Sequence, residues 1–299
     1  MSNDIYTWSS DMYPLVKKRF DDRYASRMNL IGNICGVVKQ NELTYELTGL
    51  GGYGELPVYS GGELSYADGS KSFLTTVTPT ERALAIPVSY KKAKIDMVGE
   101  ADKTGTRLAD SAYMTVLGEF YRIFGNAFTT NGADGVAWAS ASHPVNTSEE
   151  SETFSNLVTT ELSVAAICAA QAAAAQFVTA DGLPFVSNFD LLLVSPELEG
   201  TAREICGEDS LLTPAGGVGG NAYGMKYMVA GGGGLGFSGK KWALADSMLL
   251  PEVLKLVYIT EPTVVISPRE NPLVADYISY VDFSFGFGDA RPIIFADPA

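Results

Sequence analysis

The chain has 299 residues, of which 46% are apolar and 19% charged, so its composition is that of a globular protein with one large or two modest domains. Lysine and arginine number 21 against 35 acidic residues, which gives a net charge of -14. This balance argues against a nucleic-acid-binding surface, because neutralising phosphates requires clustered cations. The one cationic cluster lies in a run with a strand-like pattern, where it would discourage edge aggregation: Lys91, Lys92 and Lys94.

The first 52 residues contain an amphipathic stretch, Tyr13 to Tyr24, and apolar pieces without a core of their own. We expect them to form an N-terminal arm that lies on something else. The N-terminus has neither the basic region nor the apolar core of a signal peptide. The longest apolar run, Val164 to Val178, is mostly alanine and too short to span a membrane, so we expect no membrane contact.

Residues 53–97 predict an extended β-ribbon. Two segments with strand character, Glu55 to Tyr59 and Leu74 to Ile95, flank a polar stretch in which Asp68-Gly69 is a hairpin-turn signal. Prolines cannot donate to a strand ladder, so Pro57 and Pro87 indicate edge strands or a free ribbon. A long two-stranded ribbon is marginally stable alone in water, and we therefore expect it to dock on a partner.

The strongest predicted helix runs from about Glu100 to Phe128. Apolar side chains recur there every four residues: Leu108, Ala112, Val116, Phe120, Phe124 and Phe128. At about 1.5 Å per residue this helix would be roughly 40 Å long, which is more than a small domain needs. We expect it to be a structural element with one fully buried side.

The remaining elements alternate between helices and strands. An alanine-rich helix, about Thr160 to Phe177, is expected to be deeply packed, and Phe189 to Val194 is a buried strand. A further helix opens at Ser195-Pro196, with Ser195 as N-cap, and ends at Gly207. The predicted later strands are Met225 to Ala230, Trp242 to Asp246, Val253 to Ile259, Thr263 to Ile266 and Tyr277 to Phe285.

Two features suggest chemistry. Residues Gly234–Lys240 complete the G-x-x-x-x-G-K pattern of a phosphate-binding loop, but Lys241 replaces the Ser or Thr hydroxyl that should follow, and a strand rather than a helix comes next. His143 is the only histidine. It has no cysteine pair for a metal site and no G-x-S-x-G elbow for a nucleophile, and Pro144 restricts it to an extended backbone. We interpret His143 as structural, and its replacement by Gln is expected to leave particle yield unchanged.

The order of these parts resembles that of a tailed-phage major capsid protein of the Hong Kong 97-type fold. The residues that carry the resemblance are DGVAWASASHPVN (134–146), LLLVSPELEGTARE (191–204), WALADS (242–247) and FSFGFGDARPII (283–294). It implies an α+β fold made of an N-terminal arm (1–52), an extended β-ribbon loop (53–97), a peripheral domain with the spine helix (98–158), an axial domain (159–261) and return strands of the peripheral domain (262–299).

The resemblance also implies a function. The expected protein self-assembles as pentamers and hexamers into an icosahedral head that encloses double-stranded DNA without sequence-specific contact. It is not an enzyme, and it has no catalytic, cofactor-binding or metal-binding residues. It is made in the host cytoplasm and resides in the virion. Expected partners are copies of itself, a separate scaffolding protein, a portal and decoration proteins; only some 50 residues precede the ribbon, which favours a separate scaffold.

Two alternatives stay open at this point. The nearer one is an encapsulin-type nanocompartment shell, which resembles the same fold but holds enzymes. The other is a nucleotide-binding enzyme built on Gly234–Lys240.

Overall fold

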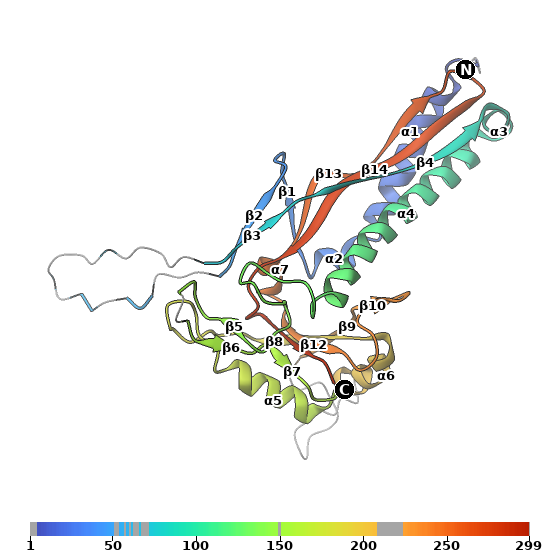
Figure 1. Ribbon diagram of the computed structural model, residues 1–299. Coiled ribbons are helices and arrows are strands. Elements are labelled where there is room, and N and C mark those ends of the chain that lie inside the picture. Colours follow the sequence, from blue (N-terminus) through green and yellow to red (C-terminus); the bar gives the residue numbers. More distant parts are fainter. Residues whose placement is uncertain are drawn as a thin grey trace.

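The computed structural model describes residues 5–50, 54–56, 58–59, 61, 66, 72–148, 151–207 and 224–298. Its outline is elongated, with two long helices and a long sheet in one part and a more compact second part (Figure 1). The elongated part contains a four-stranded sheet and the compact part a five-stranded sheet. Helices and strands both contribute to each part, and the predicted α+β class is confirmed.

The four-stranded sheet is built around a long β-hairpin. Its strands run in the order β1 (Gly36–Lys39), β13 (Leu254–Pro268), β14 (Val274–Phe287) and β4 (Thr80–Ser89). β1 is parallel to β13, and the other pairs are antiparallel. The sequence predicts two strands within β13, but it is one element with two register shifts, between Tyr258 and Thr263. Pro87 lies in β4 at the sheet edge, as predicted.

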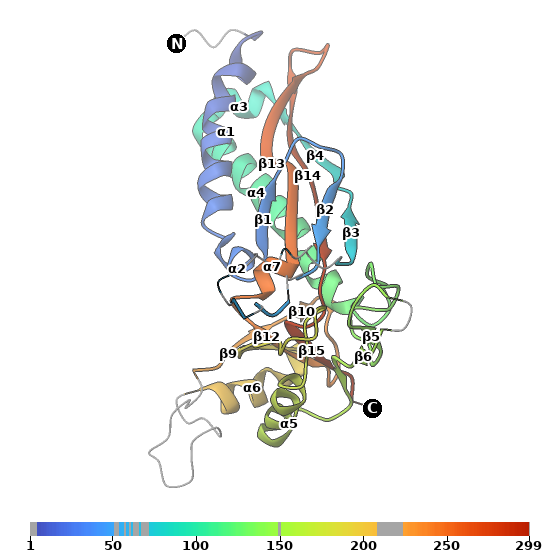
Figure 2. The ribbon, with the colours of Figure 1, turned by 90° about the vertical axis from the view of Figure 1, so that its left-hand side faces the viewer.

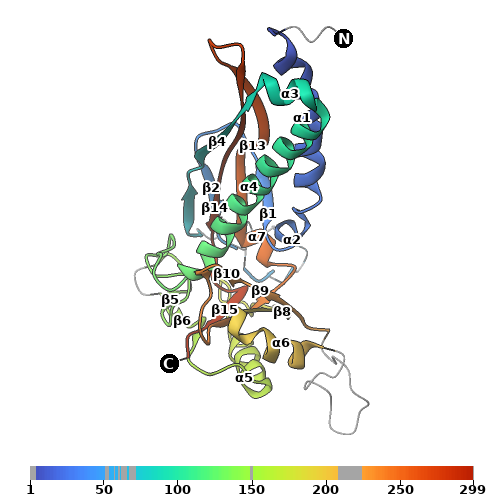
Figure 3. The ribbon, with the colours of Figure 1, turned by 90° about the vertical axis from the view of Figure 1, so that its right-hand side faces the viewer.

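Helices α1 (Trp8–Ala25) and α4 (Met97–Gly125) cover the same face of this sheet (Figures 2 and 3). α4 is the predicted spine helix, and it begins where the Asp96 carboxylate accepts a hydrogen bond from the Gly99 amide at 2.9 Å. The four-residue row is buried as predicted up to Phe124, with side chains at most 5% exposed: Leu108, Ala112, Val116, Phe120 and Phe124. Its last predicted member, Phe128, lies beyond the end of the helix and is only partly buried.

The first half of the expected N-terminal arm belongs to the subunit's own core. Side chains at four-residue spacing on α1 are at most 2% exposed: Trp8, Met12, Val16 and Phe20. A Cβ atom on Gly105 of α4 would lie 2.7 Å from the Val16 carbonyl oxygen, so glycine there permits the close contact of the two helices. Tyr277 Oη donates to the Ser9 carbonyl at 2.9 Å and ties α1 to the sheet.

The ribbon departs from its predicted boundaries. β3 (Leu74–Val77) pairs with β2 (Tyr45–Thr48), which comes from the expected arm, and the described residues between Glu55 and Tyr59 form no strand. The lysine cluster 91–94 lies on a short helix, α3 (Tyr90–Ile95), and not on a strand, since the chain leaves the sheet after Ser89 to enter α4. The turn predicted at Asp68-Gly69 falls outside the described residues.

The five-stranded sheet is the middle layer of the compact part. Its order is β7 (Leu157–Val158), β15 (Ile293–Ala296), β12 (Trp242–Asp246), β8 (Phe189–Val194) and β9 (Lys226–Val229). One face packs on α5 (Val164–Ala174) and α6 (Glu199–Cys206), and the other on the end of α4. Burial on both faces explains the unbroken apolar sequence of β8 and β12.

Two local expectations in this part need correction. α5 buries only one side, and its other side, which includes Ala165, Ala169 and Ala172, is exposed in the single chain. Ser195 precedes a short 3-10 helix (Pro196–Leu198), but its hydroxyl does not cap that helix; it donates to the Gly239 carbonyl at 2.6 Å. Gly207 ends α6 as predicted.

The chain does not pass from one sheet to the other at residue 261, the expected boundary between the axial domain and the return strands. β13 pairs with β14 along its whole length, and the chain crosses from the compact part through α7 (Leu250–Val253) just before it. The segment expected to return to the peripheral domain does not stay in the elongated part, because its last strand, β15, belongs to the five-stranded sheet. The backbone therefore enters the elongated part earlier than expected and comes back before it ends.

Replacing Phe120 by Asp tests the buried row. The change removes a fully buried ring and places a carboxylate among apolar side chains, which costs several kcal/mol. We expect an insoluble subunit or a loss of more than about 4 kcal/mol of unfolding free energy in chemical denaturation. Met114→Asp is the matched control, because Met114 is 55% exposed on the same helix. Equal stability of the two variants would contradict the packing.

Asp282 on β14 generates a second prediction. It is 7% exposed, its Oδ1 has no hydrogen-bond partner among the described residues, and Glu81 is its neighbour on β4. Burial, and then the charge of Glu81, raise the pKa of Asp282 above its usual value. The ionised form is therefore the costly one, and folded-state stability falls as the pH rises from the unfolded pKa of Asp towards the raised folded pKa.

We accordingly expect Asp282→Asn to raise the melting temperature of the isolated subunit at neutral pH, with the gain shrinking to nothing in acid. Thermal unfolding from pH 3 to pH 8 measures this. Asp276→Asn is the control, since Asp276 pairs with Arg269 at 2.7 Å and its replacement should not stabilise. A lower melting temperature of Asp282→Asn than of the wild type at neutral pH would contradict the raised pKa of Asp282.

Candidate functional site

His143 is a buried member of a polar cluster. It begins the two-residue strand β5 (His143–Pro144), which pairs with β6 (Thr153–Phe154), and it is 2% exposed. Nδ1 lies 2.6 Å from Asp134 Oδ2, and Nε2 lies 3.1 Å from Asn156 Oδ1. The imidazole stacks on Phe154 with ring centroids 5.3 Å apart. Every polar atom of the ring is therefore satisfied within the subunit.

The partners of Asn156 fix the hydrogen-bond directions. Its Oδ1 accepts from the Ser140 amide at 2.9 Å, and its Nδ2 donates to the Trp138 carbonyl at 2.7 Å. His143 Nε2 therefore faces two acceptors and donates, and Nδ1 faces the Asp134 carboxylate. The nearby serine hydroxyls, Ser140 and Ser142, contact each other at 3.5 Å and not the imidazole. The geometry is that of a structural histidine, as the sequence predicts, and not of a general base beside a nucleophile.

A second buried group lies against the same phenylalanine. The Arg291 guanidinium lies 5.1 Å from the Phe154 ring centroid, and its Nη1 is 2.6 Å from Asp289 Oδ2. Its Nη2 donates to the Val145 carbonyl at 2.6 Å, and Asp289 accepts from the Leu50 amide at 3.3 Å. Two of the motif strings, residues 134–146 and 283–294, thus meet around Phe154, next to the base of the ribbon.

The Gly234–Lys240 stretch does not form a phosphate-binding loop. Residues Gly231–Gly232 (β10) and Leu235–Gly236 (β11) form a tight hairpin, with Gly233 and Gly234 at positive φ in its turn. The chain continues into strand β12, so no helix N-terminus faces the glycines. Lys240 forms an ion pair with Glu161. The nucleotide-binding alternative is therefore wrong for this stretch.

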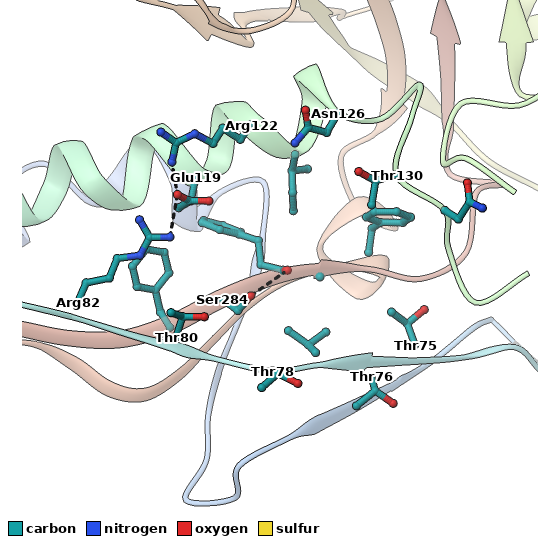
Figure 4. A pocket seen from close by; sticks show the side chains of 17 residues that line it. Thr75, Thr76, Thr78, Thr80, Arg82, Glu119, Arg122, Asn126, Thr130 and Ser284 are labelled. Carbon is teal, nitrogen blue, oxygen red and sulfur yellow. Dashed lines mark hydrogen bonds and ion pairs between the residues drawn. The ribbon is translucent and has the colours of Figure 1, made fainter. Parts of the chain in front are cut away.

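A polar groove of about 440 Å³ lies between α4 and the segment β3–β4 (Figure 4). Its floor is the end of β14, and one carboxylate and two guanidinium groups lie within it. Arg82 Nη2 is 2.8 Å from Glu119 Oε1, and Arg122 Nη1 binds the same oxygen. The rest of the lining is uncharged, and includes Thr75, Thr76, Thr78, Thr80, Asn126 and Thr130.

Sequence reasoning singles out His143 but not its partners, and it misses the groove. Asp134 lies in the same motif string as His143, and this proximity is a usable signal. Asn156 and Arg291 come from other elements, and only the packing of β6 and β15 brings them close. Within the described residues no group of three or more His, Cys, Asp or Glu side chains could hold a metal ion. None of the helices described is long and apolar enough to cross a membrane.

Comparisons with known proteins identify the family. A family model described as phage capsid protein matches residues 73–295. No curated protein sequence matches. The procapsid subunit of bacteriophage JBD30 has a TM-score of 0.54 at 13% identity, covering 97% of this chain and 75% of that chain. The capsid subunit of a native GTA particle also has a TM-score of 0.54, at 12% identity over 90% and 89% of the two chains.

A virus-like particle from Pyrococcus furiosus is similar too, with a TM-score of 0.50 at 10% identity over 94% of this chain and 97% of that chain. The fold is thus the Hong Kong 97-type fold of viral shell subunits, and the predicted fold is confirmed. The chain belongs to the phage capsid protein family. The sequence-based identification as a tailed-phage major capsid protein is confirmed as well.

The burial of His143 changes the expected effect of its replacement. His143→Gln removes the ring contact with Phe154 and leaves the Asp134 carboxylate without its partner, and we expect a loss of about 1–3 kcal/mol in unfolding free energy. Chemical denaturation measures it, and Ala141→Gln, at an exposed neighbour, is the control. If both variants are as stable as the wild type, the cluster contributes nothing to the fold.

Proposed function

We propose that this chain is a major capsid subunit that self-assembles, as pentamers and hexamers, into an icosahedral head enclosing double-stranded DNA. The supporting observation is the family match over residues 73–295, together with one shared fold across most of the chain. The similar structures are described as a procapsid, a capsid and a virus-like particle. A closed shell needs subunits that offer matching surfaces to symmetric neighbours.

The two parts of the subunit suit different places in such a shell. We assign the compact part, with the five-stranded sheet, to the axial domain near the centre of each pentamer or hexamer. The elongated part, with α1, α4 and the four-stranded sheet, corresponds to the peripheral domain. Because it is long, this part would reach and contact subunits of neighbouring pentamers and hexamers.

Exposed apolar side chains support a role for the ribbon in assembly. The three most exposed large apolar side chains of the described residues lie in or beside its tip: Val58 at 96%, Tyr66 at 90% and Leu56 at 89%. These three residues belong to none of the subunit's core clusters. Large exposed apolar groups mark interaction sites, and a neighbouring subunit would bury these.

The remaining partners follow from the proposed role. The head would enclose DNA without sequence-specific contact, and a net charge of -14 suits a container that must later release its genome. A separate scaffolding protein, a portal and decoration proteins would act during assembly, and the subunit would pass from the host cytoplasm into the virion. The role is structural and needs no cofactor.

A nanocompartment shell is the second candidate, and the similarity to the Pyrococcus furiosus particle favours keeping it. The two functions differ in contents. Particles from infected cells should protect double-stranded DNA from nuclease if the chain is a head protein, whereas a folded cargo enzyme inside them would show a nanocompartment. Negative-stain microscopy of the purified chain should show closed shells, and a protein that stays monomeric at high concentration would contradict both functions.

Shortening the ribbon tests its part in assembly. Replacing Gly61 to Ser72 by Asn-Gly should leave the thermal unfolding of the isolated subunit unchanged, because the described residues of this segment, Gly61, Tyr66 and Ser72, belong to none of the core clusters. Sedimentation should then show free subunits in place of shells. Normal particles of normal stability would mean that the ribbon is not an intersubunit clamp.

A further inference from the structure

The polar groove beside α4 has an excess of positive charge in a strongly acidic protein. Arg82 and Arg122 share a single acceptor, Oε1 of Glu119, and Glu119 is the one acid in the lining (Figure 4). The groove therefore carries a net charge of about +1, whereas the whole chain carries -14. Thr and Asn side chains complete its walls and add hydroxyl and amide donors.

The shared Glu119 carboxylate contacts one nitrogen of each guanidinium group, and a guanidinium group has five N–H donors. Arg82 Nε is buried and has no hydrogen-bond partner among the described residues. The Arg82 guanidinium lies 5.4 Å from the Phe283 ring centroid, which holds it in place over the groove floor. A held guanidinium with unused donors is suited to a carboxylate, which accepts charge-assisted hydrogen bonds in a fork geometry.

The size and position of the groove indicate where such a carboxylate would come from. A volume of about 440 Å³ accommodates a short stretch of polypeptide, and the groove opens next to β3, at the base of the ribbon. The exposed apolar side chains of the ribbon, which the proposed assembly would bury, lie farther along the same ribbon. Each copy has 35 acidic residues against 21 basic ones, so carboxylates without a cation of their own are abundant on a second copy.

We propose that the groove bounded by Arg82, Glu119 and Arg122 binds an acidic segment of a second copy of this chain, with a carboxylate of that segment beside the two guanidinium groups that Glu119 bridges. The inference rests on the proposed self-assembly and adds a specific polar contact to it. Each subunit would present one such acceptor groove, and the contact would form only between chains.

A zero-length cross-linking experiment tests the contact directly. Arg122→Lys keeps the positive charge and places a primary amine in the groove, and a carbodiimide then couples that amine to a touching carboxylate with loss of water. Assembled particles of this variant should give covalent dimers on a denaturing gel. Mass spectrometry of the dimer should join the peptide that carries position 122 to an acidic peptide of another chain.

The chain offers a matched control on the same helix. Arg107 is exposed, lies outside the groove, and forms no ion pair within the described part of the chain. Arg107→Lys should give no more dimer than wild-type particles treated in the same way. Subunits mixed from isotopically heavy and light preparations separate coupling between chains from coupling to Glu119 of the same chain.

Charge reversal supplies a second readout. Arg122→Glu should raise the subunit concentration needed for half-assembly by roughly tenfold, which is a typical effect of losing a charged pair at an interface. The melting temperature of the isolated subunit should stay close to that of Arg107→Glu. Wild-type chain that never assembles would overturn the proposed function and this inference together. Normal assembly of Arg122→Glu, or coupling of the introduced amine only to Glu119, overturns the inference and leaves the proposed function standing.

Discussion

The apolar side of α4 is the constraint on which the rest of the subunit depends. A helix of 29 residues with a buried row from Leu108 to Phe124 cannot be covered by one short element. α1 packs along its N-terminal half, the β13–β14 hairpin lies against its length, and the five-stranded sheet meets its C-terminal end. Covering this row in water therefore produces both the elongated outline and the joining of the two sheets.

The junction of the two sheets is held by polar groups that have no freedom left for chemistry. Phe154 contacts both the imidazole of His143 and the guanidinium of Arg291, and each of these has a carboxylate partner in the same subunit. Buried polar groups with complete hydrogen bonding are costly to disturb, so they specify one arrangement of the surrounding loops. This explains why the residues that look most catalytic in the sequence belong to the scaffold.

Two features that the fold leaves without a partner in the subunit lie on its surface. The ribbon exposes large apolar side chains, and the groove at its base holds two guanidinium groups that share one carboxylate. A monomer gains nothing from either feature, whereas a shell of identical subunits would bury the first and pair the second. Both features belong to the ribbon, since β3 lines the groove and forms one of its strands. Assembly would thus use the ribbon for an apolar contact and its base for a polar one.

The sequence by itself determined the elements whose signal is local. The four-residue apolar row specified α4, and unbroken apolar runs specified β8 and β12, because burial leaves a periodic trace along the chain. The tertiary structure alone decided pairings between distant segments: β2 with β3, β15 with β12, and His143 with Asn156. Such contacts depend on how separate elements pack, and short polar segments carry no periodicity from which their partners could be found. The groove could not be predicted from the sequence for the same reason. Its arginines come from β4 and α4, and they share a carboxylate only after the helix has packed on the sheet.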